Sequence, residues 1–320
     1  MLSIEYISFG DSGADASLPS VICLGCFDGV HLGHMELIRE TIALKNNKNN
    51  SNVRAVALCF STIPANLFIK NKIKSIMTLK QKLDAFKSAG LDGAYVCDFS
   101  SMHHLTPEEF VQKVLYDTCH CIGAVCGFNF SFGHLASGDH NTLSALLGAN
   151  GHTLKTVGPI SNGELNISSS LIREHLENGR CEKAAELLGK PFAIEHTIVH
   201  GKNLGEKLGF PTINHIVTED NEQIVPLDGV YATKVIINGT QYDGVTNVGK
   251  RPTVSESDVI TCETHLIDVS KDNNFYGSTA VVLFLSMLRR EKKFNSFDEL
   301  SNAIAKDIDK ARAYFKSVNL

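Results

Sequence analysis

Two histidines with a glycine between them, His31 and His34, follow an apolar run and an Asp-Gly turn. The run, residues 21–27, is typical of a buried strand, and a helical pattern of apolar residues begins beside His34. A helix that starts after a strand presents free N–H groups and the positive end of its dipole to an anion. Gly33 allows close approach of a phosphate, and both imidazoles can stabilise charge that grows on it. This pattern predicts a phosphate cradle.

A second group lies at another expected helix start. Ser168–Ser170 provide three hydroxyls, and Arg173 follows one turn later. Hydroxyls and a guanidinium in this arrangement would hold a triphosphate. Each motif alone has an ordinary alternative, because H-x-G-H is often two surface histidines and a serine run is often a helix N-cap. Their joint occurrence favours phosphate binding.

A third group is the glycine-rich stretch GKNLGEKLGFPTIN, residues 201–214. Its backbone N–H groups can wrap phosphates. Thr212 and Asn214 are two residues apart, so in an extended segment their oxygens face one side and suit Mg²⁺. Glu263, inside a strand-like run, could act as a base that orients a hydroxyl for attack on a γ-phosphate. The alternatives are a glycine-rich hairpin loop and an acid on the solvent face of a strand.

Composition limits the class of protein. The chain has 320 residues, enough for two domains, and its net charge of −5 provides no general attraction for nucleic acid or an acidic membrane. The N-terminus lacks a secretory pattern, and no apolar run reaches the roughly 18 residues of a membrane helix. We therefore expect a cytoplasmic protein with small-molecule partners. These features are also compatible with a homo-oligomer. Nine cysteines need not pair there, and Cys23-Leu-Gly-Cys26 lacks the further ligands of a zinc site.

Strands and helices are expected to alternate in the first half of the chain. The expected strands are 21–27, 53–60, 93–99, 122–130 and 152–160, with helices at 34–45, 79–90, 106–119 and 141–151. This alternation predicts an α/β, Rossmann-like domain with a parallel sheet. After Gly189, short runs rich in Val, Ile and Thr predict a mainly antiparallel β-barrel, which a C-terminal helix follows. We place the domains at residues 1–187 and 188–320.

FDGVHLGH together with ISSSLIR resembles the nucleotidylyltransferase superfamily with H-x-G-H and I-S-S-T-x-x-R motifs. More narrowly, it resembles the FMN adenylyltransferase module of prokaryotic bifunctional riboflavin kinase/FAD synthetases, and the similarity extends through LTPEEFVQKVL and VCGFNFSFGHLASGD. The resemblance implies that His31 and His34 contact the ATP phosphates. It also implies a nucleotide-binding set of Gly25, Phe27, Asp28, Gly33, Asn129, Ser168, Ser169, Ser170 and Arg173.

The glycine-rich stretch resembles the phosphate loop of riboflavin kinases, and DGVYATKV, GVTNVGKRPTV, CETHLIDV and LRREKKFNSFDEL follow in that family's order. The resemblance implies that Glu263 activates the ribityl 5′-hydroxyl and that Thr212 and Asn214 hold Mg²⁺ with ATP. It implies further nucleotide contacts from Gly201, Lys202, Gly205, Gly209 and Pro211. It implies a flap and flavin contacts from Asn247, Gly249, Arg251 and Arg289.

The expected function is therefore phosphorylation of riboflavin to FMN by the C-terminal domain and adenylylation of FMN to FAD by the N-terminal domain, both with ATP and Mg²⁺. One departure concerns the flavin side of the adenylyl site, where residues 60–64 read FSTIP in place of F-x-P-[HR]-P. Three alternatives follow: an active kinase with a silent N-terminal domain, a different nucleotidyl acceptor, or a non-catalytic flavin sensor. The intact histidines and Glu263 argue against the sensor, because binding alone needs no base.

Overall fold

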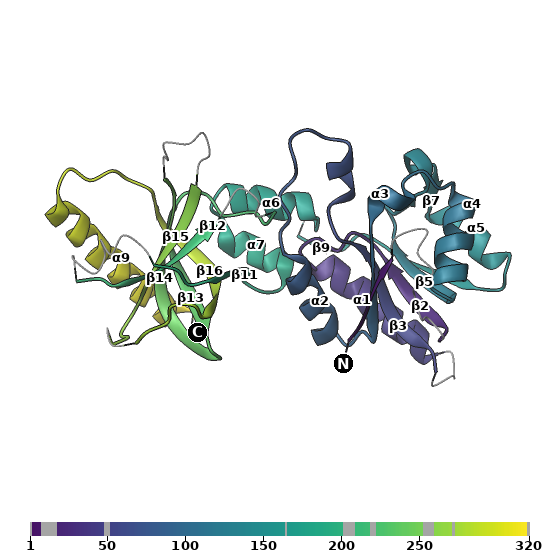
Figure 1. Ribbon diagram of the computed structural model, residues 1–320, viewed down its shortest axis with the longest axis horizontal. Helices are drawn as coiled ribbons and strands as arrows, with labels where there is room; N and C mark the ends of the chain where they lie inside the picture. The colour runs from purple at the N-terminus through teal and green to yellow at the C-terminus, as the bar shows by residue number, and fades with distance from the viewer. Residues whose placement is uncertain are drawn as a thin grey trace. The chain divides into compact units, whose positions relative to one another are not determined.

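The computed structural model describes residues 2–7, 18–47, 52–163, 165–200, 209–217, 222–251, 259–270 and 273–318. The chain forms two compact units, Met1–Ser169 and Ser170–Leu320, and each is described by itself (Figure 1). By its contacts, the segment between residues 170 and 187 belongs to the second unit. The expected domain limits, 1–187 and 188–320, stay a prediction.

The first unit contains a parallel sheet, which confirms the predicted α/β class. In the described chain it has six strands in the order β1-β4-β3-β2-β5-β8. Their bounds are β1 Ser3–Ile7, β2 Ser20–Leu24, β3 Arg54–Phe60, β4 Gly93–Cys97, β5 Cys121–Gly127 and β8 Thr153–Val157. The strand order reverses between β2 and β5, and ligands of such sheets bind at the carboxyl ends of the strands at this switch point.

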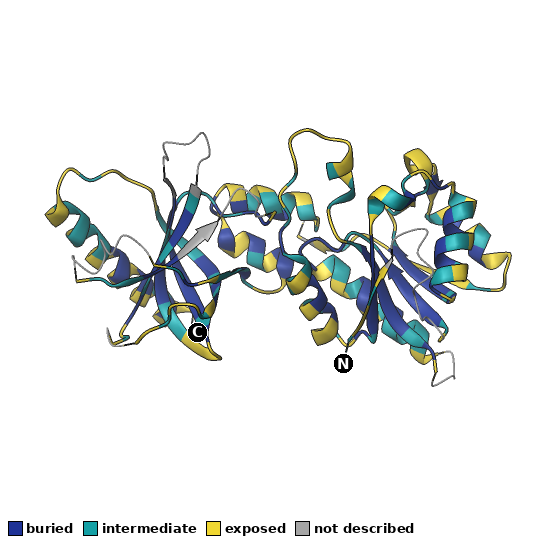
Figure 2. Cartoon of the chain, in the orientation of Figure 1, coloured by how far each residue is buried: buried dark blue, intermediate teal, exposed yellow. Residues whose placement is uncertain are grey.

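Helices cover both faces of this sheet. Along β2 successive side chains alternate between two cores: Ile22 and Leu24 pack in one, and Cys23 packs in the other. The Cys23 core includes residues of α1 (Leu32–Asn46) and α2 (Leu79–Ser88). The opposite core includes residues of η2 (Phe110–Thr118) and α5 (His140–Gly148). Figure 2 shows the buried strands between partly exposed helices.

Helix starts follow the sequence signals. Thr78 caps α2 and Thr106 caps α4 (Pro107–Glu109), each in a capping box with the third helical residue. The expected helix at 106–119 is confirmed in place but not in type, because its main part, η2, is a π-helix. Such wider turns are frequent near functional sites.

Strand β1 was not predicted. It pairs in parallel with β4 at the sheet edge, and Glu5 forms an ion pair with Arg54 at 2.7 Å. Tyr6 is 69% exposed, so β1 lacks the continuous apolar pattern of the inner strands. The remaining short elements of this unit are η1 Pro64–Leu67, α3 Phe99–Met102, β6 Ser131–Phe132, η3 His134–Ala136, β7 Gly138–Asp139, β9 Ser161–Asn162 and β10 Leu165–Asn166.

The second unit confirms the predicted antiparallel domain with a C-terminal helix. Its described strands form one curled sheet in the order β11-β16-β13-β14-β15-β12. The bounds are α6 Ser169–Glu177, α7 Cys181–Leu188, β11 Phe192–Thr197, β12 Thr212–Val217, β13 Gly229–Ile237, β14 Thr240–Arg251, β15 Val259–Leu266, β16 Thr279–Arg290 and α9 Phe297–Ser317. Val199, just beyond β11, bridges to Asn214 of β12, so the two edges of the sheet approach each other as in a half-barrel.

Helix α9 packs on this sheet through Ile308, Ala311 and Phe315, which join Val230 and Val245 in one core.

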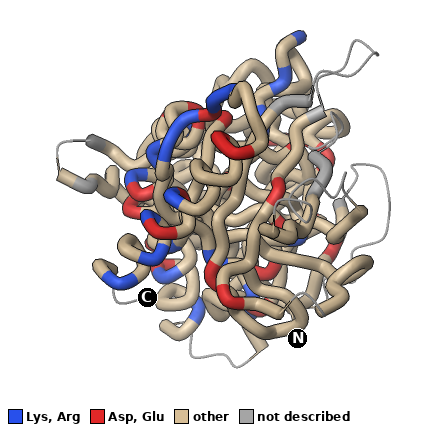
Figure 3. The backbone as a smooth tube through the Cα atoms, turned by 90° about the vertical axis from the view of Figure 1, so that its left-hand side faces the viewer, with Lys and Arg blue, Asp and Glu red and all other residues tan. Residues whose placement is uncertain are grey.

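Basic and acidic positions are interspersed along the described chain (Figure 3). Among the described residues no helix is both long and apolar enough to cross a membrane.

Candidate functional sites

The turn after β2 is conformationally strained. Phe27, Gly29 and Val30 have φ angles of 53°, 89° and 41°. A positive φ is a true outlier for a β-branched residue such as Val30, and such strain clusters at functional sites. Asp28 holds the turn: its Oδ1 accepts the Ile76 N–H at 2.8 Å, and its carbonyl accepts the Ser169 hydroxyl at 2.8 Å.

The structure brings His31 and His34 together. His31 is the N-cap of α1, and its Nδ1 accepts the His34 N–H at 3.3 Å. The two rings stack with centroids 3.6 Å apart and an interplanar angle of 14°. Because Nδ1 of His31 accepts, its neutral ring carries the proton on Nε2, where it can donate to an anion. The buried Nδ1 of His34 has no hydrogen-bond partner among the described residues.

Both imidazoles are neutral near pH 7. Burial lowers the pKa of His31 from 6.5 to about 4. Burial also lowers the pKa of His34 well below its usual value, and the charges of His31 and Lys82 add to this effect. The pair therefore offers neutral N–H donors to a phosphate, and an arriving anion would favour their protonation.

The depressed pKa of His31 predicts a stability change with pH. The unfolded chain binds a proton at His31 below pH 6.5, whereas the folded protein binds it only near pH 4. Stability is therefore full above pH 6.5 and falls as the pH drops towards 4, by about 3 kcal/mol for this group. Urea unfolding at pH 7 and pH 4.5 should show a smaller loss in His31→Asn than in native protein. Equal losses would contradict the assigned burial effect.

The turn contains one buried aromatic ring, that of Phe27, and two glycines, Gly25 and Gly33, that lie close to rings. Phe27 is fully buried, and its ring packs 5.2 Å from that of Phe86 and 5.1 Å from that of His34, so its side chain belongs to the core. A Cβ on Gly25 would lie 3.2 Å from the Phe27 ring, and one on Gly33 would lie 3.2 Å from the His31 ring. Both glycines therefore give these rings room.

Asn129 lies beyond the end of β5, the strand next to β2 at the switch point. Its side chain is exposed, and its Oδ1 lies 3.1 Å from where a Cβ on Gly127 would be. Ser168 is exposed just before α6, and Ser169 reaches the β2 turn through Asp28. Ser170 and Arg173 follow on α6.

Two features at this edge of the sheet were not predicted. Lys82 of α2 donates to backbone carbonyls at the ends of β2 and β3. An aromatic cluster of Phe60, Phe68, Phe99 and His103 also gathers at the ends of β3 and β4. Phe68 is 67% exposed, so this cluster presents an aromatic face to solvent.

In the second unit, Glu263 lies between two amides. It pairs directly with Asn214 of β12 on one side and with Asn247 of β14 on the other. Directly opposite residues of antiparallel strands share a face, with Cβ atoms about 5 Å apart. Asn214 is 7% exposed, and Glu263 and Asn247 are half-buried. Three of the predicted residues therefore form one polar row.

Thr212 lies on the same face as Asn214, two residues earlier on β12. The Asn214 Nδ2 donates to the Thr212 carbonyl at 3.4 Å, so its Oδ1 is the amide atom available to a cation. With the Thr212 hydroxyl, this hard oxygen donor set fits Mg²⁺. Pro211 accepts a hydrogen bond from His265 through its carbonyl, and Gly209 has a φ of 86°. Gly201, Lys202 and Gly205 lie outside the described residues.

Two further predicted flavin residues, Gly249 and Arg251, follow Asn247 along β14. The Glu291 carboxylate lies over Gly249, 2.6 Å from the place of a Cβ. Burial and the nearby Asp228 carboxylate raise the pKa of Glu291. Arg251 ends β14, and its side chain lies outside the described residues.

Arg289 pairs with Val230, which pairs with Asn247, so it belongs to the same row. Its Nε donates to both carboxylate oxygens of Asp307 on α9, at 2.8 and 3.1 Å. Its guanidinium also lies 5.4 Å from the centroid of the Phe294 ring. A contact of Arg289 with flavin stays a prediction.

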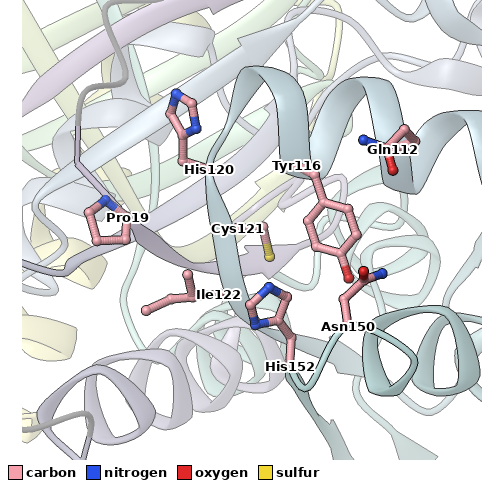
Figure 4. A pocket seen from close by; sticks show the side chains of 8 residues that line it. All are labelled: Pro19, Gln112, Tyr116, His120, Cys121, Ile122, Asn150 and His152. Carbon is pink, nitrogen blue, oxygen red and sulfur yellow. The ribbon is translucent and has the colours of Figure 1, made fainter.

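The cysteines are reduced, and a surface pocket lies away from the phosphate cradle. All nine cysteines are described and none forms a disulfide, and no described group of His, Cys, Asp and Glu could hold a metal ion. A pocket of about 460 Å³ is lined by residues such as Tyr116 and His152 (Figure 4). Pro19, His120 and His152 directly precede β2, β5 and β8, so this pocket lies at the amino edge of the sheet, opposite the phosphate cradle.

Fold and sites together define a nucleotide-dependent transferase with two modules. The family model described as FAD synthetase matches residues 14–171, and the one described as riboflavin kinase matches residues 188–315. A bifunctional riboflavin kinase/FMN adenylyltransferase of Bacillus subtilis is 34% identical over 93% of both chains. The protein of that name from Escherichia coli K12 is 33% identical over 92% of both. The chain belongs to the bifunctional riboflavin kinase/FMN adenylyltransferase family.

A crystal structure from Streptococcus pneumoniae, described as a macrolide-efflux protein, has the same fold. It superposes with a TM-score of 0.86 at 27% identity, covering 97% of this chain and 99% of its own.

Proposed function

We propose that this chain phosphorylates riboflavin to FMN in its second unit and adenylylates FMN to FAD in its first. The order of the two family matches along the chain supports this assignment. The observation that carries the kinase assignment is the polar row Asn214–Glu263–Asn247, in which the Glu263 carboxylate lies between two amides.

In the kinase reaction, Glu263 accepts the proton of the ribityl 5′-hydroxyl. The hydroxyl oxygen forms a bond to the γ-phosphorus, the bond to the β-phosphate oxygen breaks, and ADP leaves. Thr212 and Asn214 would hold Mg²⁺, which neutralises phosphate charge when bound. Orientation of the hydroxyl and the phosphate by these residues supplies most of the catalysis.

In the adenylyl reaction, a phosphate oxygen of FMN forms a bond to the α-phosphorus of ATP, and pyrophosphate leaves. His31 and His34 donate N–H groups to the phosphates at the N-terminus of α1, where the helix dipole adds its field. Asn129, Ser168 and Ser169 hold the remaining nucleotide oxygens.

The aromatic cluster supports a flavin as the acceptor. Phe68 and His103 present rings beside Phe99 at the ends of β3 and β4. A planar isoalloxazine can stack on such a surface, whereas a small sugar or alcohol acceptor gains little from it. This favours FMN over another nucleotidyl acceptor, even with FSTIP at residues 60–64 in place of F-x-P-[HR]-P.

The decisive experiment incubates the protein with riboflavin, ATP and Mg²⁺ and separates the flavins by chromatography. We expect FMN first and FAD after it. FMN without FAD would identify an active kinase with a silent or differently directed first unit. Unchanged riboflavin with bound flavin would identify the non-catalytic sensor.

Thr212→Val and Asn214→Ala should impair only the kinase. Each removes one oxygen ligand, and we expect KM for Mg-ATP in FMN formation to rise at least ~10-fold. FAD formation from supplied FMN is the internal control, because it uses the other site. If both reactions fall together, the assignment of separate sites is wrong.

We place the enzyme in the cytoplasm with riboflavin, FMN and ATP as its partners, and we keep residues 1–187 and 188–320 as its two functional domains. The interspersed charges of Figure 3 support small-molecule partners over nucleic acid.

A further inference from the structure

A buried lysine lies under the phosphate cradle. Lys82 is the fourth residue of α2 and is 6% exposed. Its ammonium donates to the Cys26 carbonyl at 3.0 Å and to the Phe60 carbonyl at 3.2 Å. Cys26 lies in the loop that leads from β2 to the histidines, and Phe60 is the last residue of β3.

This charge is unfavourable for the fold. The partners of the Lys82 ammonium in the described chain are two backbone carbonyls and no carboxylate, and burying an ammonium without an ion pair is expensive. A cation near the N-terminal turn of a helix also opposes the helix dipole. Lys82 shares its helix face with Leu83 and Phe86, which are buried in the sheet core, so an apolar residue would suit the position.

The location of the charge is favourable for chemistry. β2 and β3 are parallel neighbours, so both carbonyls lie at the carboxyl edge, where ligands of such sheets bind. Burial raises the pKa of the Cys59 thiol to about 11, and the charge of Lys82 opposes that rise. Burial lowers the pKa of His34, and the same charge adds to the effect, so the field of Lys82 acts on one of the cradle histidines. Solvent ions screen a buried charge poorly.

We propose that Lys82 is a positioning residue for adenylyl transfer, which holds the histidine turn against the end of β3 and keeps a positive charge behind the two phosphates that must meet. The inference rests on the proposed adenylyl function of the first unit. The end of β3 leads to the aromatic cluster, so Lys82 connects the nucleotide side to the acceptor side. Two anions repel each other as they approach, and an unscreened cation reduces that repulsion most in the transition state.

The test compares Lys82→Met, Lys82→Arg and the control Lys80→Met in the full-length protein. Met keeps the length and apolar stem without charge, and Arg keeps the charge. Lys80 lies on the same helix, but its side chain is 67% exposed beside Asp84. We expect Lys82→Met to lower kcat for FAD formation about 10²-fold with a smaller change in KM for ATP. Lys82→Arg should recover part of the loss, and Lys80→Met should behave as native protein.

Two further readouts decide between positioning and folding. Lys82→Met should unfold at the native temperature or above it, and its riboflavin phosphorylation should be unchanged. A lower unfolding temperature would mean that the charge serves the fold, and native kcat would mean that the charge is idle; either result overturns the proposal. Native protein is measured beside the variants. If native protein itself makes no FAD, the proposed adenylyl function is wrong, and this outcome differs from a native kcat in Lys82→Met.

Discussion

Glu263→Gln should lower the rate of FMN formation by about 10²–10⁴-fold, the usual effect of losing a general base. Glutamine keeps the size and shape of the side chain, so it can occupy the row between Asn214 and Asn247. It cannot accept the ribityl proton, and the attacking oxygen then carries that proton into the transition state. The measurement is initial FMN formation under saturating ATP and Mg²⁺, with KM for riboflavin and ATP determined separately.

The control for this substitution is Glu195→Gln. Glu195 is also half-buried in the same sheet, but it pairs with Val281 on β16, away from the polar row. We expect native FMN formation from Glu195→Gln and unchanged KM values from Glu263→Gln. Native turnover by Glu263→Gln would reject Glu263 as the base. A loss confined to KM would instead make it a binding residue.

The local parts of both sites could be predicted from the sequence. His31 and His34 were expected at a helix start because strand, turn and helix follow within a dozen residues. Thr212 and Asn214 were expected on one face because the two-residue period of a strand is a local property. The structure adds that His31 is itself the N-cap of α1.

The non-local parts needed the structure. The pairing of Glu263 with Asn214 and Asn247 depends on the register of three strands, and a shift by one residue would turn their side chains to opposite faces. Strand β1 escaped prediction because it is an exposed edge strand with a weak apolar pattern. Phe27 was expected in the nucleotide site by its motif, whereas its side chain packs against Phe86.

The unusual position of Lys82 could have been recognised in the sequence. Leu79, Leu83 and Phe86 define the apolar face of α2, and Lys82 occupies a position of that face by its spacing. A charged residue on an apolar face breaks the local rule, and such violations concentrate at functional sites. The sequence alone does not identify its partners, because the carbonyls of Cys26 and Phe60 lie 56 and 22 residues away.

Substitution of the cradle histidines should slow FAD formation and let FMN accumulate. We expect a loss of about 10²–10³-fold in kcat for each residue, similar to the removal of a donor from an oxyanion site. His34→Ala removes the ring stacked on His31, and His31→Asn removes the Nε2 donor. Asparagine retains a side-chain acceptor that can cap α1, so helix stability should change little. Riboflavin phosphorylation should continue in both variants, because its residues lie in the other unit.

A histidine at the opposite edge of the same sheet provides the control. His152 directly precedes β8 and lines the pocket at the amino edge, so His152→Ala should make FAD as native protein does. Equal losses in all three variants would indicate a general effect on the first unit. If native protein makes FAD and the cradle variants make it equally fast, the stacked pair is a structural cap. Both rings are neutral in the free protein, and neither loses a proton between pH 7 and 8. If they act as donors, kcat/KM for FAD formation should therefore stay nearly constant over that range.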